Sequence, residues 1–323
     1  MKPITWFALA LTTILVSCNK SQKSDQLSVA VIPKGTTHIY WKSVEAGAKK
    51  AAAELDVKVT FIGPQREDDR SQQIDLVSNQ ALQNDAIVLA PLDAVALRDA
   101  TKTVAGKGKP VVIIDSGLAD SAGFITSYVA TDNREGGRIA ARRISELLSG
   151  KGKVAMLRYM QGSASTEQRE EGFLEEIKKS PGIEVVSAEQ FSGATASQAQ
   201  DVAANLLTRL AEGDGLSIQG LFCSNQTNTY GMLQALRGKN LAGKVKFVGF
   251  DCDATFIDAL KKGEMNGTVL QDPVNMGYLG VKTAVAKLKG EKVEAIIDTG
   301  ATLVTQENMS EPKTAALIKS QLP

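Results

Sequence analysis

The sequence predicts an α/β fold of two doubly wound parallel-sheet lobes, and two observations carry this prediction. Short apolar runs alternate with longer amphipathic stretches, which is the pattern of βαβ units in a parallel sheet covered by helices on both faces. The chain has 323 residues, more than one hydrophobic core comfortably supports. We therefore expect two domains of about 150 residues each.

In the first half of the chain, two amphipathic segments of helical period separate the first apolar runs. These helices are expected at Tyr40–Leu55 and Arg70–Gln83. The strands are expected at Leu27–Ile32, Val57–Ile62, Ala86–Ala90, Val111–Ile114 and Phe124–Ala130.

The same alternation of apolar runs and amphipathic stretches begins again in the second half, which predicts a second sheet of the same kind. Helices are expected at Arg134–Leu148, Thr166–Lys179, Ser197–Leu210, Thr229–Leu236 and Ala254–Lys261. Strands are expected at Val154–Leu157, Glu184–Val186, Gly220–Cys223, Val245–Gly249 and, ended by a proline, at Gly267–Pro273.

No linker rich in proline or serine divides the two halves, so the chain must cross between them at regular strands. The crossings are expected at Ala130–Asn133, Gly267–Pro273 and Thr299–Thr302. They form a multi-strand hinge with a cleft between the lobes. The lobes then comprise 27–131 plus 272–300 and 132–271 plus 301–323.

The N-terminus is interpreted as an export signal rather than as part of the fold. Residues 1–17 combine Lys2 with an apolar segment too short to span a membrane, which needs about 20 residues. The run LVSC ending at Cys18 resembles the lipobox of bacterial lipoproteins, so we expect lipidation of Cys18 and a polar lipidated tether over 18–26. A plain secretory signal with an incidental cysteine is the alternative.

Charge and cysteine content exclude several classes of function. The chain has 37 basic and 36 acidic side chains, and removal of the signal takes away one lysine and leaves the charges balanced. A nucleic-acid surface is therefore not expected. An extracytoplasmic setting permits a disulfide between Cys223 and Cys252, but nothing in the sequence determines their distance. With a single histidine and no CxxC or HExxH spacing, no metal site or cofactor is expected.

Polar side chains end several predicted strands, and these are the candidate binding residues. Carboxylate, amide and guanidinium groups can each pair with two vicinal hydroxyls, so together they predict recognition of a polyhydroxyl ligand. Singly, each has a plainer explanation as a helix cap, a turn residue or a surface ion pair; Asp251 could simply cap the helix that begins near Ala254. The candidates are Asp115, Arg169, Asn225, Asp251 and Gln271.

A second candidate feature is the corner Val31–Gly47, where a strand runs through a loop into a helix. Tyr40 and Trp41 lie in the first turn of that helix. Ligands of open α/β sheets bind outside the carboxyl ends of the strands, and aromatic faces suit the C–H faces of a sugar. Both residues could also be ordinary packing aromatics.

Several segments together resemble the type I periplasmic solute-binding proteins of the ribose-binding group, over nearly the whole mature chain. They are IYWKSVEAGAKKAA, ALQNDAIVLAPLDA, VVIIDSG, VATDNREGGRIAA, GSASTEQREEGFLEEI, FCSNQTNTYGMLQAL, KFVGFDCD and GTVLQDPVNMG. The resemblance implies a monomer that closes two lobes over a sugar or polyol and delivers it to the permease of an ABC importer. It implies stacking by Tyr40 and Trp41 and polar contacts from Asp115, Arg169, Asn225, Asp251 and Gln271.

The chain departs from this group at positions that affect the ligand. His38 stands where the group has a loop asparagine, and Lys34 lies in a loop that is one residue longer, so both are added to the candidate site. Ser116 and Ala194 replace an arginine and an aromatic residue of the group. These changes argue against ribose itself as the ligand. Lys34 and His38 could bring positive charge for an acidic sugar, but Asp115 and Asp251 offset it, so a neutral sugar or polyol is expected.

The sequence also bears on three other classes of function: enzymes, repressors and sensory binding proteins. There is no GxSxG motif, no P-loop and no histidine besides His38, so an enzyme is not expected. Repressors of the lactose type resemble this core, but they carry a basic helix-turn-helix where this chain has an export signal. A sensory binding protein that docks to a chemoreceptor or histidine kinase is the remaining alternative, which the sequence does not distinguish from an import protein.

Overall fold

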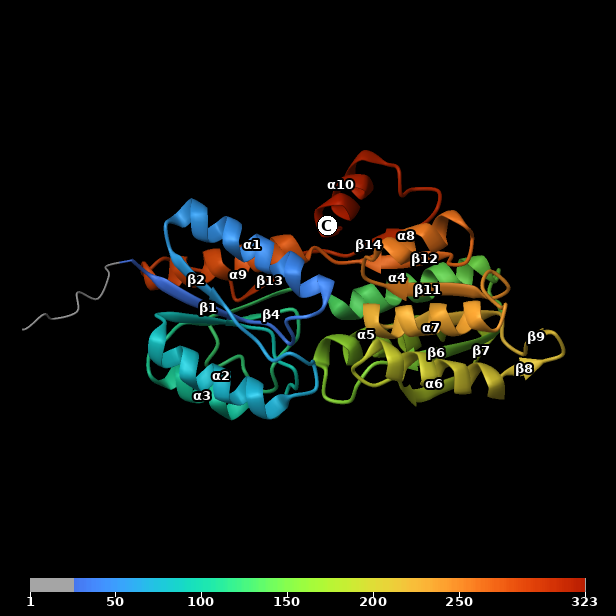
Figure 1. The fold of residues 1–323 in the computed structure, drawn as a ribbon, viewed down its shortest axis with the longest axis horizontal. Coiled ribbons are helices and arrows are strands. Elements are labelled where there is room, and N and C mark those ends of the chain that lie inside the picture. Colours follow the sequence, from blue (N-terminus) through green and yellow to red (C-terminus); the bar gives the residue numbers. More distant parts are fainter. Residues whose placement is uncertain (1–25, 323) are drawn as a thin grey trace, which may run out of the picture.

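The computed structural model describes residues 26–322, and it divides into two halves, each built around one mixed or parallel sheet (Figure 1). The signal peptide and Cys18 lie outside these residues. The first half contains helices α1 (Ile39–Leu55), α2 (Arg70–Gln83), α3 (Arg98–Gly106) and α9 (Pro273–Leu288). Its strands are β1 (Ser28–Ile32), β2 (Lys58–Phe61), β3 (Ala86–Leu89), β4 (Val111–Ile114), β5 (Ser127–Ala130) and β13 (Ile296–Asp298).

The second half contains helices α4 (Asn133–Leu147), α5 (Ala164–Ile177), α6 (Ala196–Arg209), α7 (Gln226–Gly238), α8 (Ala254–Lys261) and α10 (Pro312–Gln321). Its sheet consists of β6 (Lys151–Arg158), β7 (Gly182–Phe191), β10 (Gly220–Cys223), β11 (Lys246–Phe250), β12 (Gly267–Leu270) and β14 (Thr302–Val304). A small separate hairpin is formed by β8 (Ala211–Glu212) and β9 (Gly215–Leu216).

Both sheets have the same doubly wound order, which confirms the predicted fold class. The strands run β2-β1-β3-β4-β5-β13 in the first sheet and β7-β6-β10-β11-β12-β14 in the second. All neighbours are parallel except β12 and β14. In such sheets the ligand crevice lies beyond the carboxyl ends of the central strands. The two halves therefore bring equivalent strand ends towards each other.

Burial explains which apolar runs became central strands. All four residues of β3, β4, β10 and β12 are buried, as expected for strands covered by helices on both faces. The edge strand β7 instead alternates between exposed and partly buried residues, and it extends well beyond the predicted Glu184–Val186. The predicted strand was too short because β7 alternates in polarity, and only its apolar centre resembles a buried strand.

The chain passes between the two sheets three times. The passages follow β5, β12 and β13. Two of them are joined by the hydroxyl of Thr131, which donates to the carbonyl oxygen of Gly300 at 3.1 Å. The lobe limits 27–131 plus 272–300 and 132–271 plus 301–323 remain a proposal, because α10 contacts α1 and α9 of the first half while its Ile318 joins the core of the second.

Each half contains one pair of helices in very close contact, α1 with α9 and α4 with α5. In Figure 1, α1 and α9 lie side by side although they are far apart in the sequence. Glycines permit this approach: a Cβ atom on Gly47 would lie 1.8 Å from the carbonyl oxygen of Val274, and one on Gly137 would lie 1.9 Å from that of Arg169. The second pair therefore packs α4 directly against the backbone of α5, the helix that carries Arg169.

Among residues 26–322, none of the helices is both long enough and apolar enough to cross a bilayer.

We expect Gly137→Ala to lower the free energy of unfolding by about 1–3 kcal/mol, because the new methyl group would overlap a backbone oxygen that cannot rotate away. Urea unfolding followed by circular dichroism measures the change. The matched control is Gly238→Ala, where the added Cβ meets nothing within 4 Å. The control should keep or slightly raise stability. Equal stability of the two variants would contradict the close-packing argument.

Candidate functional site

The two halves enclose a polar cavity between the carboxyl ends of their central strands. Its empty volume is about 340 Å³, counted up to the opening of the cleft. All nine residues predicted from the sequence as ligand contacts line this cavity: Lys34, His38, Tyr40, Trp41, Asp115, Arg169, Asn225, Asp251 and Gln271. The structure thus brings the whole candidate set together, although their contact with a ligand remains a prediction.

Asp115 is the centre of the first-half wall. It follows β4 in the left-handed backbone region, with a φ of 63°. Its carboxylate accepts hydrogen bonds from the Tyr40 hydroxyl at 2.9 Å and from the Lys34 ammonium group at 2.8 Å. Burial and the nearby Asp115 charge raise the pKa of Tyr40 well above its usual value, so the phenol stays a donor. Both carboxylate oxygens of Asp115 therefore have partners within the protein.

The aromatic corner is tied to the opposite half through Glu67. The Trp41 indole donates to Glu67 Oε1 at 2.7 Å, and the Tyr159 hydroxyl of the second half donates to Glu67 Oε2 at 3.0 Å. Tyr40 and Trp41 pack edge to face, with centroids 4.9 Å apart. His38 caps α1, and its Nδ1 accepts from the Tyr40 backbone N–H. Trp41 and Tyr40 line the cavity and also belong to the hydrophobic core.

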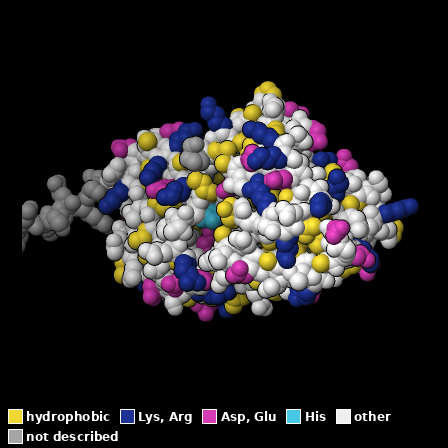
Figure 2. Space-filling view, turned by 45° about the vertical axis from the view of Figure 1, so that its right-hand side comes forward, with side chains coloured by type: hydrophobic (Ala, Val, Ile, Leu, Met, Phe, Trp, Pro, Cys, Tyr) yellow, Lys and Arg dark blue, Asp and Glu magenta, His cyan; other side chains and the backbone are white. Residues whose placement is uncertain are grey.

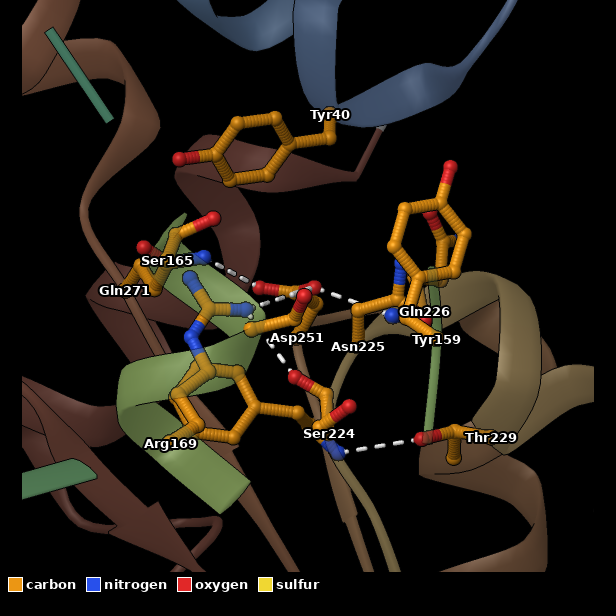
Figure 3. A network of polar contacts seen from close by, with 12 residues as sticks. Tyr40, Tyr159, Ser165, Arg169, Ser224, Asn225, Gln226, Thr229, Asp251 and Gln271 are labelled. Carbon is orange, nitrogen blue, oxygen red and sulfur yellow. Dashed lines mark hydrogen bonds and ion pairs between the residues drawn. The ribbon is translucent and has the colours of Figure 1, made fainter. Parts of the chain in front are cut away.

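Asp251 occupies the equivalent position in the second half, at the end of β11 with a φ of 70°. Figure 3 shows Gln271 and Gln226 converging on its carboxylate. The Gln271 amide donates to Oδ1 at 2.7 Å and the Gln226 backbone N–H donates to Oδ2 at 3.0 Å. The alternative explanation as a helix cap is wrong, because Asp253 caps α8. Asp251 instead accepts from the first backbone N–H of α7 (Gln226–Gly238) and lines the cavity.

Two opposing effects act on the pKa of Asp251. Burial raises it, while the Arg169 guanidinium and the Gln271 hydrogen bond lower it, and the net direction is upward. The Arg169 Nη1 atom lies 4.0 Å from Asp251 Oδ2, so this ion pair is loose. The closest partners of the carboxylate are the amide groups of Gln226 and Gln271. A poorly compensated buried carboxylate gains from further hydrogen-bond donors.

The Arg169 guanidinium is held by three contacts within the protein. Its guanidinium lies over the Phe250 ring at 4.0 Å, donates from Nε to the Asn133 side-chain oxygen at 2.8 Å and from Nη1 to the Ser224 carbonyl at 3.1 Å. Asn133 also donates to the Asp115 carbonyl at 3.2 Å. Arg169 is thereby linked to the opposite wall of the cavity through one residue at the hinge.

Asn225 combines both interpretations that its sequence position allows. Its side chain caps α7 in a reciprocal pair with Asn228, and the residue also lines the cavity. The structure thus assigns it a capping role, while its contact with a ligand is still a prediction.

Further polar contacts cross the cleft around the cavity. The Lys34 ammonium group donates to the Ser165 hydroxyl at 3.0 Å, and the Ser165 N–H donates to the Ser116 hydroxyl at 3.1 Å. At the rim, the Ala94 N–H donates to the Gly162 carbonyl at 3.0 Å. The two halves are therefore in direct contact around the cavity that lies between them.

The sequence reading missed five lining residues, which lie mostly on loops or at helix starts. Gln226 immediately follows a predicted residue, and its proximity was the one available signal. The positions of the other four in the cavity depend on how the two halves meet, and a local sequence pattern carries no information about that. The missed residues are Glu67, Tyr159, Ser165, Thr166 and Gln226.

Behind the cavity lies a buried carboxyl group, that of Glu170. Its Oε1 accepts from the Tyr159 N–H at 3.0 Å and from the Ser224 hydroxyl at 2.8 Å. Its Oε2 has no hydrogen-bond partner among the described residues, and the Arg158 Nε atom is 3.8 Å away. Burial raises the pKa of Glu170 to about 7. Glu170 does not line the cavity, but it binds Tyr159, which does, and Ser224, whose carbonyl oxygen accepts from Arg169.

Neither a disulfide nor a metal site appears in the part of the chain that the structure describes. Cys223 and Cys252 are both buried free thiols, so the disulfide that the sequence allowed is not formed. Burial raises the pKa of each thiol. No cluster of His, Cys, Asp and Glu side chains suitable for a metal ion is found within residues 26–322.

We expect the Glu170 carboxyl to make stability depend on pH. The pKa of Glu170 is raised to about 7 in the folded state. Between its ordinary pKa and about 7 the folded protein therefore holds a proton that the unfolded chain has lost, and the free energy of unfolding falls as pH rises through this range. Glu170→Gln removes this titration, so its free energy of unfolding should rise relative to wild type by up to about 3 kcal/mol between pH 4.5 and pH 8. Urea unfolding at several pH values measures it.

Glu291→Gln, at an exposed glutamate, is the control and should run parallel to wild type over the same range. Parallel curves for Glu170→Gln as well would contradict the assigned burial effect.

Comparison with known proteins supplies the family. A model of the periplasmic binding protein domain matches residues 29–292. The ribose import binding protein of Haemophilus influenzae is 30% identical over 307 residues, covering 95% of this chain and 100% of the relative. The D-allose-binding periplasmic protein of Escherichia coli is 29% identical over 299 residues, covering 90% of this chain and 93% of the relative.

A solved structure agrees with the sequence comparisons. The carbohydrate transporter solute-binding protein of Agrobacterium radiobacter, in complex with D-arabinose, is 39% identical and superimposes with a TM-score of 0.86, covering 91% of this chain and 99% of that one. The match covers both halves and the cleft between them. The chain belongs to the periplasmic binding proteins of type I, in the ribose-binding group, and is a non-enzymatic solute-binding protein.

Proposed function

We propose that this protein captures a small neutral sugar or polyol between its two lobes outside the cytoplasm and delivers it to an ABC importer. The observation that carries the proposal is a pair of buried amide oxygens, Gln226 Oε1 and Gln271 Oε1, that line the cavity without a hydrogen-bond partner among the described residues. Buried acceptors of this kind are satisfied by donors, and a polyhydroxyl ligand supplies several at once.

The charges of the cavity support a neutral ligand. Lys34 is paired with Asp115, and Arg169 faces Asp251, so each cation has an anion beside it. Glu67 adds a further carboxylate, whose two oxygens accept from Trp41 and Tyr159. An anionic sugar would meet no unpaired positive charge here, whereas hydroxyl groups can exchange hydrogen bonds with every one of these side chains. The ribose import binding protein and the D-allose-binding periplasmic protein among the relatives support the same ligand class.

Ligand capture follows from closure about the hinge, the motion described for periplasmic binding proteins. Ligand hydroxyls held by Asp115 on one wall would recruit Asp251 and Gln271 on the other. The hydrogen bond from Lys34 to Ser165 would then close the cleft over the ligand. A ligand shifts the balance of open and closed forms only by its higher affinity for the closed form. The closed surface is what a permease would recognise.

A neutral sugar or polyol should stabilise the protein by about 2.7 kcal/mol at a hundred times its dissociation constant. The test is a thermal-shift screen of the purified full chain with D-ribose, D-allose, D-arabinose, D-galactose, myo-inositol, galacturonate, L-alanine and L-glutamate, followed by calorimetric titration. Stabilisation by the amino acids alone would contradict the proposal.

The same titration should assign Asp251. Hydrogen bonds to a charged group contribute about 1.5–3 kcal/mol each, so Asp251→Ala should weaken binding ten- to a hundredfold or more. The control is Asp201→Ala, at an exposed aspartate of α6, which should leave affinity unchanged. Unchanged affinity in Asp251→Ala would remove this residue from the binding site.

We also propose that the protein is anchored to a membrane by lipid on Cys18, because LVSC follows an apolar segment and precedes a polar run. One acyl chain binds a membrane only marginally, while several anchor a protein stably. Cys18→Ala should abolish metabolic labelling with a fatty acid and leave the precursor uncleaved, as judged by its mass. Normal labelling of this variant would overturn the anchor, whereas Cys223→Ala should label like wild type.

A further inference from the structure

A second, wider pocket adjoins the ligand cavity at the mouth of the cleft. Its empty volume is about 860 Å³, against about 340 Å³ for the inner cavity. Its walls come from both halves, with Thr37 and Gln65 on one side and Ala194 and Tyr230 on the other. In the space-filling view a histidine side chain is visible in the groove between the halves (Figure 2), and the chain has a single histidine.

Three residues line both pockets and so form the boundary between them, which we call the neck: His38, Glu67 and Gln226. Gln226 is 6% exposed, its amide nitrogen donates to Asp253 at 2.8 Å, and its Oε1 has no partner among the described residues. His38 accepts at Nδ1, so in the neutral ring the proton is on Nε2, which can donate. The neck therefore offers one free acceptor, Gln226 Oε1, and one donor, His38 Nε2, at the boundary of the two pockets.

The outer pocket has the chemistry of a sugar subsite. Ala194, Ala196 and the Tyr230 ring provide apolar surface, and Thr227 and Thr195 add polar groups at its edge. Its charged residues are already paired: Arg66 binds Asp68, and Glu67 accepts from Trp41 and Tyr159. No unpaired charge selects for a phosphate or carboxylate. Apolar surface beside hydroxyl groups suits the two kinds of face on a pyranose ring.

We propose that the outer pocket is a second subsite, which holds the second sugar unit of a neutral disaccharide whose first unit occupies the inner cavity. This inference rests on the proposed function, since it needs a sugar in the inner cavity. The glycosidic linkage passes the neck, where a neighbouring hydroxyl donates to Gln226 Oε1 and an oxygen accepts from His38 Nε2. The inner residues select the first unit, and the outer pocket adds affinity for the second.

The test is calorimetric titration of the full chain with maltose, cellobiose, lactose and melibiose beside glucose and galactose. We expect at least one disaccharide to bind ten times more tightly than either of its constituents. Disaccharides that all bind ten times more weakly than the monosaccharides would overturn the subsite while leaving the proposed function intact. If no sugar of either size binds, the proposed function fails and the subsite fails with it.

A pair of tryptophan variants separates the two pockets. Gln65→Trp, at an exposed residue that lines only the outer pocket, places a bulky side chain there and should weaken disaccharide binding at least tenfold while changing monosaccharide binding by less than twofold. Ala211→Trp, on the exposed hairpin strand β8 outside both pockets, should change neither. Equal loss of both ligand sizes in Gln65→Trp would overturn the assignment, and melting curves of both variants establish that they are folded.

Discussion

Two aspartate carboxylates, buried at equivalent strand ends in opposite lobes, are the constraint around which this molecule is arranged. Asp115 and Asp251 are 4% and 6% exposed, and both adopt a left-handed backbone that residues other than glycine seldom take. Burying a carboxylate is costly unless donors surround it. Lys34, Tyr40, Gln271 and the start of α7 are placed to supply those donors. The polar character of the cleft follows from this requirement.

Much of the fold and the core of the site could be predicted from sequence, because both depend on short-range patterns. Apolar runs predicted the central strands, and the carboxyl ends of parallel strands share one edge, so Asp115, Asp251 and Gln271 were expected together. Glu67 could not be found in this way, because its role depends on Tyr159 of the other half. Only the apolar centre of the long edge strand β7 was predicted, because its other residues are polar and partly exposed. The helix α3 was not predicted; it is short, and only Thr101 and Val104 of its nine residues are buried.

The two halves repeat not only a strand order but also a way of packing helices. In each, glycines bring one helix against the backbone of another: Gly47 and Gly277 between α1 and α9, and Gly137 and Gly172 between α4 and α5. Tyr40 and Trp41 begin α1, and Arg169 lies on α5. The tight pairs therefore hold the side chains of the site on rigid elements, which limits the entropy lost when a ligand is bound.

The three passages of the chain between the sheets have a mechanical consequence. Adjacent passages are joined to one another, by Thr131 to Gly300 and by the pairing of β12 with β14, so they behave as a strip rather than as separate threads. We expect such a strip to bend across its width more readily than it twists or slides. Relative movement of the lobes should then approach rotation about one axis, a single degree of freedom. The search for the closed arrangement would become one-dimensional, with the same two walls meeting at each closure.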